Sequence, residues 1–148
     1  MAGRNDLEIT VVGKPVVAGS AEGIAIVSNQ PISFWGGVSH RTGKIIDRRH
    51  ERLGATITGK VFVFPQGKGS CTGSATLLEC IKAGKGPAAI VNLRVDPILA
   101  LGAILADELY HKTVPILVVA QEDFDVIQEG DNLNIEADGT IRIWTRKS

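Results

Sequence analysis

The second half of the chain alternates short apolar runs with segments of helical periodicity. Three apolar runs have the length and composition of buried strands: Lys60–Phe64, Ala88–Val91 and Pro115–Val119. Between them, Ala75–Ala83 carries apolar residues on one helical face, and Asp96-Pro97 is a good N-cap and first-turn proline for a second helix. This alternation predicts a parallel sheet with right-handed crossovers.

The two ends of the chain show a different pattern. Leu7–Val12 and Gly23–Val27 are short, β-branched and apolar, and Asn132–Glu136 and Thr140–Trp144 flank a turn at Asp138-Gly139. We therefore expect an α/β fold with three layers, namely an antiparallel sheet, a parallel core sheet and helices on one face. Residues 1–148 are predicted to form one domain, with residues 1–6 flexible.

A long irregular segment, Ser28–Arg49, separates the two patterns. Long loops in compact domains are often functional. One stretch places two large aromatics before paired glycines: Ser33, Phe34, Trp35, Gly36 and Gly37. Two interpretations remain open here, a plug packed on the core, or a site wall or subunit contact, where aromatics are enriched.

Composition narrows the class of protein. The chain of 148 residues has 16 basic and 16 acidic side chains, without the basic excess typical of nucleic-acid or membrane-surface proteins. Cys71 and Cys80 match no zinc or iron-sulfur spacing, so no metal site is predicted in this chain. The N-terminus lacks a signal-peptide core and no apolar run approaches a membrane span, so we expect a cytoplasmic protein.

The glycine-rich segment Gly67–Ser74, GKGSCTGS, lies between a predicted strand and a predicted helix. In open α/β sheets ligands bind at the carboxyl ends of strands, and the first amides of a helix attract negative charge. Those donors could stabilise an alkoxide at Ser70, which makes it the candidate catalytic base. The spacing fits neither a Walker A loop nor a nucleophile elbow, and a tight turn in which small residues simply fit remains an equal alternative.

The chain thus offers one candidate catalytic group and no cofactor ligands. It is either a non-catalytic module that binds small anions or part of a larger active site. Four blocks in order, SFWGGV at 33–38, TGKIID at 42–47, GKGSCTGS at 67–74 and PAAIV with DPILALGAILA at 87–106, resemble the small subunit, or swivel domain, of the aconitase X family. The resemblance covers about Leu7 to Trp144.

That resemblance implies a hydro-lyase with a large partner subunit that holds an iron-sulfur cluster. It implies that Ser70 removes the proton α to a substrate carboxylate, while the cluster iron accepts the hydroxyl. The substrate-binding residues would come from the same loop: Gly67, Lys68, Gly69, Cys71, Thr72, Gly73 and Ser74. The usual family loop resembles GGRGS, so Lys68 keeps the charge of the arginine and loses its bidentate fork.

Two activities occur in the family, dehydration of cis-3-hydroxy-L-proline and of mevalonate 5-phosphate. The Phe-Trp-Gly-Gly block and DPILALG are more similar to the hydroxyproline type. The basic pair Arg48-Arg49 could meet a phosphate or a partner subunit and keeps the second activity open. No nucleic-acid or membrane partner is expected.

Overall fold

The computed structural model describes residues 7–68 and 72–145. The predicted flexible residues 1–6 lie outside this range, as do Gly69, Ser70 and Cys71 of the predicted site loop. The described strands are β1 (Leu7–Val12), β2 (Lys14–Val17), β3 (Ala21–Val27), β4 (Val61–Val63), β5 (Ala89–Asn92), β6 (Ile116–Val118), β7 (Asn132–Ile135) and β8 (Thr140–Thr145). The described helices are α1 (Phe34–Gly37), α2 (Thr72–Lys82), α3 (Pro97–Tyr110) and α4 (Gln121–Val126).

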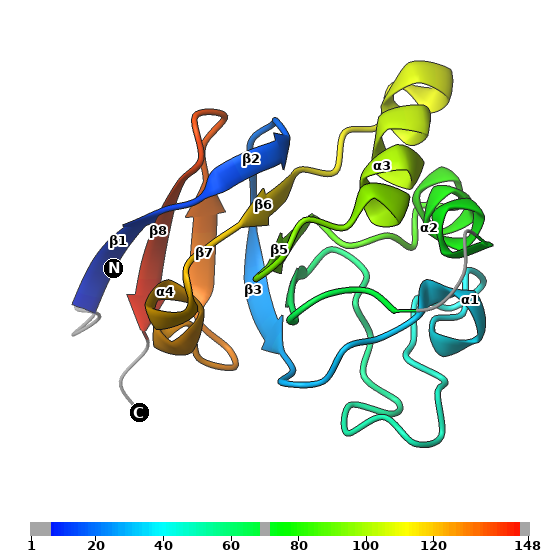
Figure 1. The fold of residues 1–148 in the computed structure, drawn as a ribbon, viewed down its shortest axis with the longest axis horizontal. Coiled ribbons are helices and arrows are strands. Elements are labelled where there is room, and N and C mark those ends of the chain that lie inside the picture. Colours follow the sequence, from blue (N-terminus) through cyan, green and yellow to red (C-terminus); the bar gives the residue numbers. More distant parts are fainter. Residues whose placement is uncertain (1–6, 69–71, 146–148) are drawn as a thin grey trace.

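The described strands form a mixed sheet in the order β1-β8-β7-β3-β4-β5-β6-β2. Strand β3 belongs to both halves, because its first residues pair antiparallel with β7 and its last residues pair parallel with β4. The pairs β4–β5 and β5–β6 are parallel, as the alternating pattern predicts. Figure 1 shows the two halves turned toward each other, with α1, α2 and α3 on the outer side of the parallel half.

The sheet is nearly closed into a barrel, because its two outer strands are consecutive in the chain. Only Gly13 separates β1 at one end of the strand order from β2 at the other. The Gly13 amide donates to the Gly139 carbonyl over 2.8 Å. Gly139 has φ +100°, and a Cβ there would collide with the Gly13 carbonyl, so this contact requires glycine at the hairpin turn.

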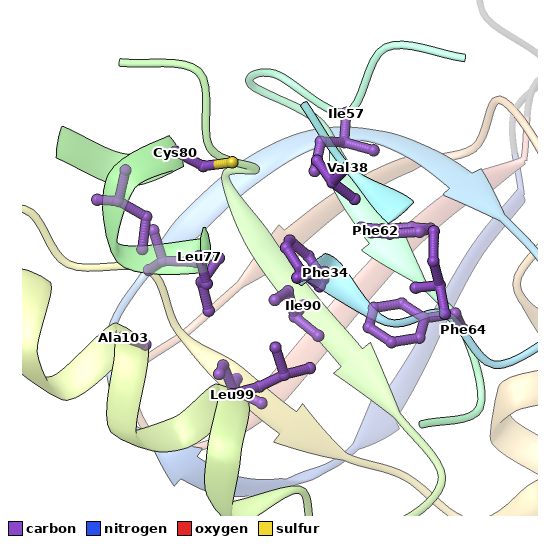
Figure 2. Packing of buried hydrophobic residues seen from close by; sticks show 14 of the residues in the cluster. Phe34, Val38, Ile57, Phe62, Phe64, Leu77, Cys80, Ile90, Leu99 and Ala103 are labelled. Carbon is purple, nitrogen blue, oxygen red and sulfur yellow. The ribbon is translucent and has the colours of Figure 1, made fainter. Parts of the chain in front are cut away.

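Two buried clusters separate the three layers. The first lies inside the curled sheet and includes Val61, Val63, Leu133 and Ile141. The second lies between the parallel strands and the helices, and its side chains come from the opposite face of the same strands. Figure 2 shows this second cluster: Phe34, Val38, Ile57, Phe62, Phe64, Leu77, Cys80, Ile90, Leu99 and Ala103. The predicted three-layer β/β/α arrangement is therefore confirmed.

Helices α2 and α3 approach closely because a glycine lies at their contact. A Cβ on Gly102 of α3 would stand 2.6 Å from the Ser74 carbonyl oxygen of α2. This closeness brings the first turns of the two helices together, since Gly73 lies opposite Ile98.

Three features differ from the prediction. The helix predicted from Ala75 begins at Thr72, because the small residues before it continue the helical backbone. Strand β2 was not predicted, since a four-residue segment containing Pro15 gives little strand signal, yet it occupies the sheet edge, where proline is tolerated. Helix α4 was also not predicted, and its Phe124 packs inside the sheet rather than on the helix layer.

The long segment between β3 and β4 is held to the strand ends by polar contacts. Glu51 accepts hydrogen bonds from the Ser28 hydroxyl at 2.6 Å and from the Asn29 amide at 2.8 Å, and these bonds hold its pKa below the ordinary value. Arg52 pairs with Glu129 at 2.8 Å. These contacts tie residues 51–52 of the long segment to the end of β3 and to the residues before β7.

Candidate active site

A depression of about 280 Å³ lies at the carboxyl ends of the parallel strands β4 and β5. Parallel sheets commonly bind ligands at this edge. The described residues that line it come from three segments of the chain: Ile32, Phe34, Gln66, Gly67, Lys68, Gly73, Arg94, Val95, Asp96, Pro97, Ile98 and Leu99.

The floor of the depression is set by backbone pairing beyond the ends of the strands. After β4, the chain continues alongside Ile32, whose amide donates to the Gln66 carbonyl at 3.3 Å and whose carbonyl accepts from the Lys68 amide at 3.1 Å. On the other side, the Leu93 amide donates to the Pro65 carbonyl at 2.9 Å. The chain after β4 is thus anchored to Leu93 at Pro65 and to Ile32 as far as Lys68.

Asp96 connects this loop to helix α3. Its Oδ1 accepts hydrogen bonds from the Ile98 and Leu99 amides at 3.0 and 3.2 Å, which confirms the predicted N-cap. Its Oδ2 faces Gly67 so closely that a Cβ at that position would collide with it. The absence of a side chain at Gly67 therefore allows the loop and the helix cap to meet.

The electrostatic character of the depression is mixed. Helices α2 and α3 both begin beside it, and a helix N-terminus carries partial positive charge. Lys68 and Arg94 are exposed at its lining and add two full positive charges. Asp96 contributes a negative charge on the same lining. Such a combination can bind a small carboxylate and can contact a cationic group next to it.

A buried amide secures the strand end beneath the depression. Asn92, the last residue of β5, is fully buried, and its Nδ2 donates to the Phe64 carbonyl at 2.9 Å. This bond fixes the point where the chain leaves β4 and turns into the glycine-rich segment. The Phe64 ring packs against Phe62 in a tilted arrangement with centroids 4.3 Å apart, which further restrains that point.

The structure brings some of the predicted site residues together. Gly67, Lys68 and Gly73 line the depression, and so does Phe34, which is also buried against Phe62 and Phe64. Phe34 is therefore packed on the core and also lines the depression, and its role as a site wall stays a prediction.

Other predicted residues occupy different places. Thr72 and Ser74 fall in the first turn of α2, and Ser74 lies against α3 rather than on the lining of the depression. Trp35 is exposed next to the buried Phe34, and the Ser33 hydroxyl donates to its carbonyl at 3.0 Å.

The two glycines that end α1 have different environments. Gly36 has φ +77°, with nothing near its Cα that would obstruct a side chain, whereas Gly37 is buried against Ile32. Arg48 and Arg49 are exposed on the long segment and do not line the depression.

The sequence interpretation missed Arg94, and it assigned Asp96 only a capping role. A signal was available, because β4 and β5 were predicted as neighbouring parallel strands whose carboxyl ends share one sheet edge. The residues that follow β5 should therefore face the same ligand as the residues that follow β4.

The described residues include no grouping of three or more His, Cys, Asp and Glu side chains able to hold a metal ion. Cys80 is buried in the helix-side cluster, where burial and the nearby Glu79 raise the pKa of its thiol to about 11. The described residues therefore do not fit an iron-sulfur cluster. In the two described ranges, no helix has both the length and the apolar character needed to cross a bilayer.

The described fold is a three-layer α/β domain with a depression at one edge of its parallel sheet. A family model described as the aconitase X swivel domain matches residues 10–143, and the chain belongs to this family. It is 46% identical over 115 residues to the cis-3-hydroxy-L-proline dehydratase of Pseudomonas aeruginosa, covering 78% of this chain and 20% of that protein. The chain therefore spans about a fifth of the length of that relative.

Two further relatives cover most of both chains. The chain is 36% identical over 139 residues to the phosphomevalonate dehydratase small subunit of Methanosarcina mazei, covering 93% of this chain and 92% of that subunit. A crystal structure of Thermococcus kodakaraensis aconitase X in its holo-form has a TM-score of 0.82 at 35% identity, covering 91% of this chain and 98% of that one. The chain is thus a swivel domain of a dehydratase family, and its relatives differ in the substrate that their names state.

Proposed function

We propose that this chain, as one domain over residues 1–148, is the small subunit of a cis-3-hydroxy-L-proline dehydratase. The observation that carries the proposal is the depression at the carboxyl edge of the parallel strands, where two helix N-termini and two cations converge. The relatives support the substrate, since the hydroxyproline dehydratase of Pseudomonas aeruginosa is 46% identical and the small subunit of Methanosarcina mazei is 36% identical.

In this proposal Ser70 is the base that removes the proton α to the substrate carboxylate. It stands two residues after Lys68, which lines the depression, and two before Thr72, where α2 begins. The proposal places its hydroxyl near the backbone donors at the start of α2. Each well-aimed donor can stabilise a developing oxyanion by roughly 3 kcal/mol, which makes an alkoxide base accessible.

The substrate carboxylate would be held by the cations and amides on the same lining. Lys68 and Arg94 would supply charge, and the start of α2 would supply backbone donors. Phe34 and Ile98 supply apolar surface for a small ring. Fixing the carboxylate sets the α-proton beside the base, which is the contribution of orientation to catalysis.

The proposal requires a large partner subunit that holds an iron-sulfur cluster. That cluster would supply a Lewis acid for the hydroxyl that leaves. Closure of the swivel domain over the partner would exclude water from the depression and bring the serine to the opposite side of the substrate. We expect the complex to be cytoplasmic.

Dehydration of mevalonate 5-phosphate is the second candidate. It is favoured by relatives named as phosphomevalonate dehydratase small subunits, such as that of Methanosarcina mazei, of which the chain covers 92%. The exposed pair Arg48-Arg49 could then meet a phosphate if the partner surface brought the phosphate near it.

The test is an assay of the assembled two-chain complex with both substrates side by side. With the preferred substrate, Ser70→Ala should lower kcat by a factor of at least about 1,000 and change KM little, because the base acts only in the transition state. Ser20→Ala removes a hydroxyl at the opposite edge of the parallel sheet, just before β3, and should leave kcat unchanged. Near-normal turnover by the Ser70 variant would exclude it as the base, and turnover of phosphomevalonate alone would exclude the hydroxyproline substrate.

A further inference from the structure

Three formal charges line the depression, and one of them has the wrong sign for an anion site. Lys68 and Arg94 attract a carboxylate, whereas Asp96 repels it. All three residues line one depression of about 280 Å³. The arrangement therefore suits a ligand that carries both signs of charge.

The capping role of Asp96 does not by itself require a carboxylate. Serine and asparagine cap helices about as well as aspartate, and neither brings a negative charge. Capping uses Oδ1, which accepts from the Ile98 and Leu99 amides. The other oxygen, Oδ2, stands over Gly67 at the loop side of the depression. The carboxylate thus presents charge to the same lining as Lys68, and a neutral cap would favour a purely anionic ligand.

Gly67 supports the same conclusion from the other side of the contact. A side chain there would displace Oδ2, and its absence keeps the carboxylate at the loop. The φ of Gly67 lies outside the left-handed region, so the close approach of Asp96 is the constraint that requires glycine at this position.

We propose that Asp96 binds the ammonium group of a zwitterionic α-amino acid whose carboxylate is held by Lys68 and Arg94. This inference rests on the proposed function, and it names Asp96 as the residue that selects the class of substrate. A cyclic α-amino acid carries its nitrogen and its carboxylate on the same carbon atom, so both charges can contact the lining together. A phosphorylated hydroxy acid has no cation for Asp96 and adds negative charge that it repels.

The experiment compares two ligands of nearly equal shape on the assembled complex. L-Proline and cyclopentanecarboxylate share a five-membered ring and a carboxylate, and only proline has the cationic nitrogen. Titration calorimetry should give proline about 10- to 100-fold tighter binding, the range expected for a charged hydrogen bond. Asp96→Asn keeps a capping oxygen and removes the charge, so it should abolish this preference and leave binding of cyclopentanecarboxylate equal or tighter.

Two controls separate recognition from folding. Asp96→Ser removes the charge with a different capping side chain and should behave like Asp96→Asn. Glu108→Gln removes an exposed carboxylate near the far end of α3 and should preserve the preference. Equal binding of the two ligands by the unsubstituted complex, no measurable proline binding, or a preference that survives in Asp96→Asn would each overturn the inference.

Failure of this inference and failure of the proposed function give different results. A complex that dehydrates hydroxyproline with an unchanged KM in Asp96→Asn would refute the role of Asp96 and retain the proposed function. A complex that binds proline through Asp96 but dehydrates only phosphomevalonate would refute the proposed substrate.

Discussion

Replacing Gly67 with alanine should test how tightly the site loop and helix α3 are coupled. The new Cβ would collide with Oδ2 of Asp96 and stand 3.3 Å from its Cγ. The carboxylate must then turn away, and the amides of Ile98 and Leu99 lose part of their cap. The perturbation is a single methyl group, and its expected effect is on the free energy of unfolding.

The magnitude follows from three contributions. Overpacking by one methyl group costs about 1–3 kcal/mol, and a weakened cap costs about 1 kcal/mol. The lower entropy of the unfolded chain with alanine returns about 0.4–1 kcal/mol. The net destabilisation should be about 2 kcal/mol, equivalent to a fall in Tm of about 4–8 °C for a domain of this size.

A double-mutant cycle isolates the collision. Asp96→Ala alone should cost about 1 kcal/mol through loss of the cap. In that background the nearest remaining atom to a Cβ at Gly67 is Cδ1 of Leu99 at 3.4 Å, an ordinary contact, so Gly67→Ala should be nearly neutral. The coupling free energy between the two sites should therefore be about 2 kcal/mol.

Urea unfolding followed by far-ultraviolet circular dichroism measures all four corners of this cycle. Values for the two substitutions that add to within about 0.5 kcal/mol would refute the contact between loop and cap. A large effect of Gly67→Ala that persists in the Asp96→Ala background would show that the glycine is required for another reason.

Three further results are expected. Gly102→Ala should destabilise the fold by about 1 kcal/mol in the same assay, because the clash with the Ser74 carbonyl outweighs the gain in helix propensity; a stabilised variant would contradict the close α2–α3 packing. In a Cys71→Ser chain, the buried thiol of Cys80, whose pKa is raised to about 11, should react with a disulfide reagent only after unfolding. Rapid reaction of the folded chain would contradict the burial of Cys80. The folded-state pKa of Glu51 is lowered from 4.5, so its contribution to the free energy of unfolding is complete above pH 4.5 and disappears as the pH falls through the lower folded-state value. Thermal melts should show the unsubstituted chain more stable than Glu51→Gln by at most about 1 kcal/mol, because the group is exposed, and this difference should vanish in acid. A difference that grows toward low pH would contradict the lowered pKa.

The layers of the fold could be predicted because their signals are local. The apolar run at β4, the periodicity of α2 and the Asp96-Pro97 start of α3 are each encoded in a few consecutive residues. Strand β2 carries no such signal, since Lys14–Val17 is a strand only because the edge of β6 is available to it. Its existence depends on tertiary pairing, which a single sequence does not display.

The site was predictable only in part for a related reason. Glycines and a lysine between a strand and a helix are visible as a cluster in the sequence, and Gly67 and Lys68 do line the depression. Arg94 and Asp96 belong to the next strand-to-helix connection, and they reach the same volume only because β5 lies beside β4 in the sheet. The charge balance of the depression, on which the proposed choice of substrate depends, is a property of both connections together.

The pairing of β1 with β8 sets a limit on how early this fold can be completed during synthesis. Leu7 of β1 pairs with Thr145 of β8, so the first described strand must wait for the last described strand to be synthesised. The parallel strands and α3 are all made by residue 118, and they can assemble while β1 still has an open edge. An exposed edge strand is a template for unwanted pairing, and the edge of β1 stays exposed until the β7–β8 hairpin has been synthesised.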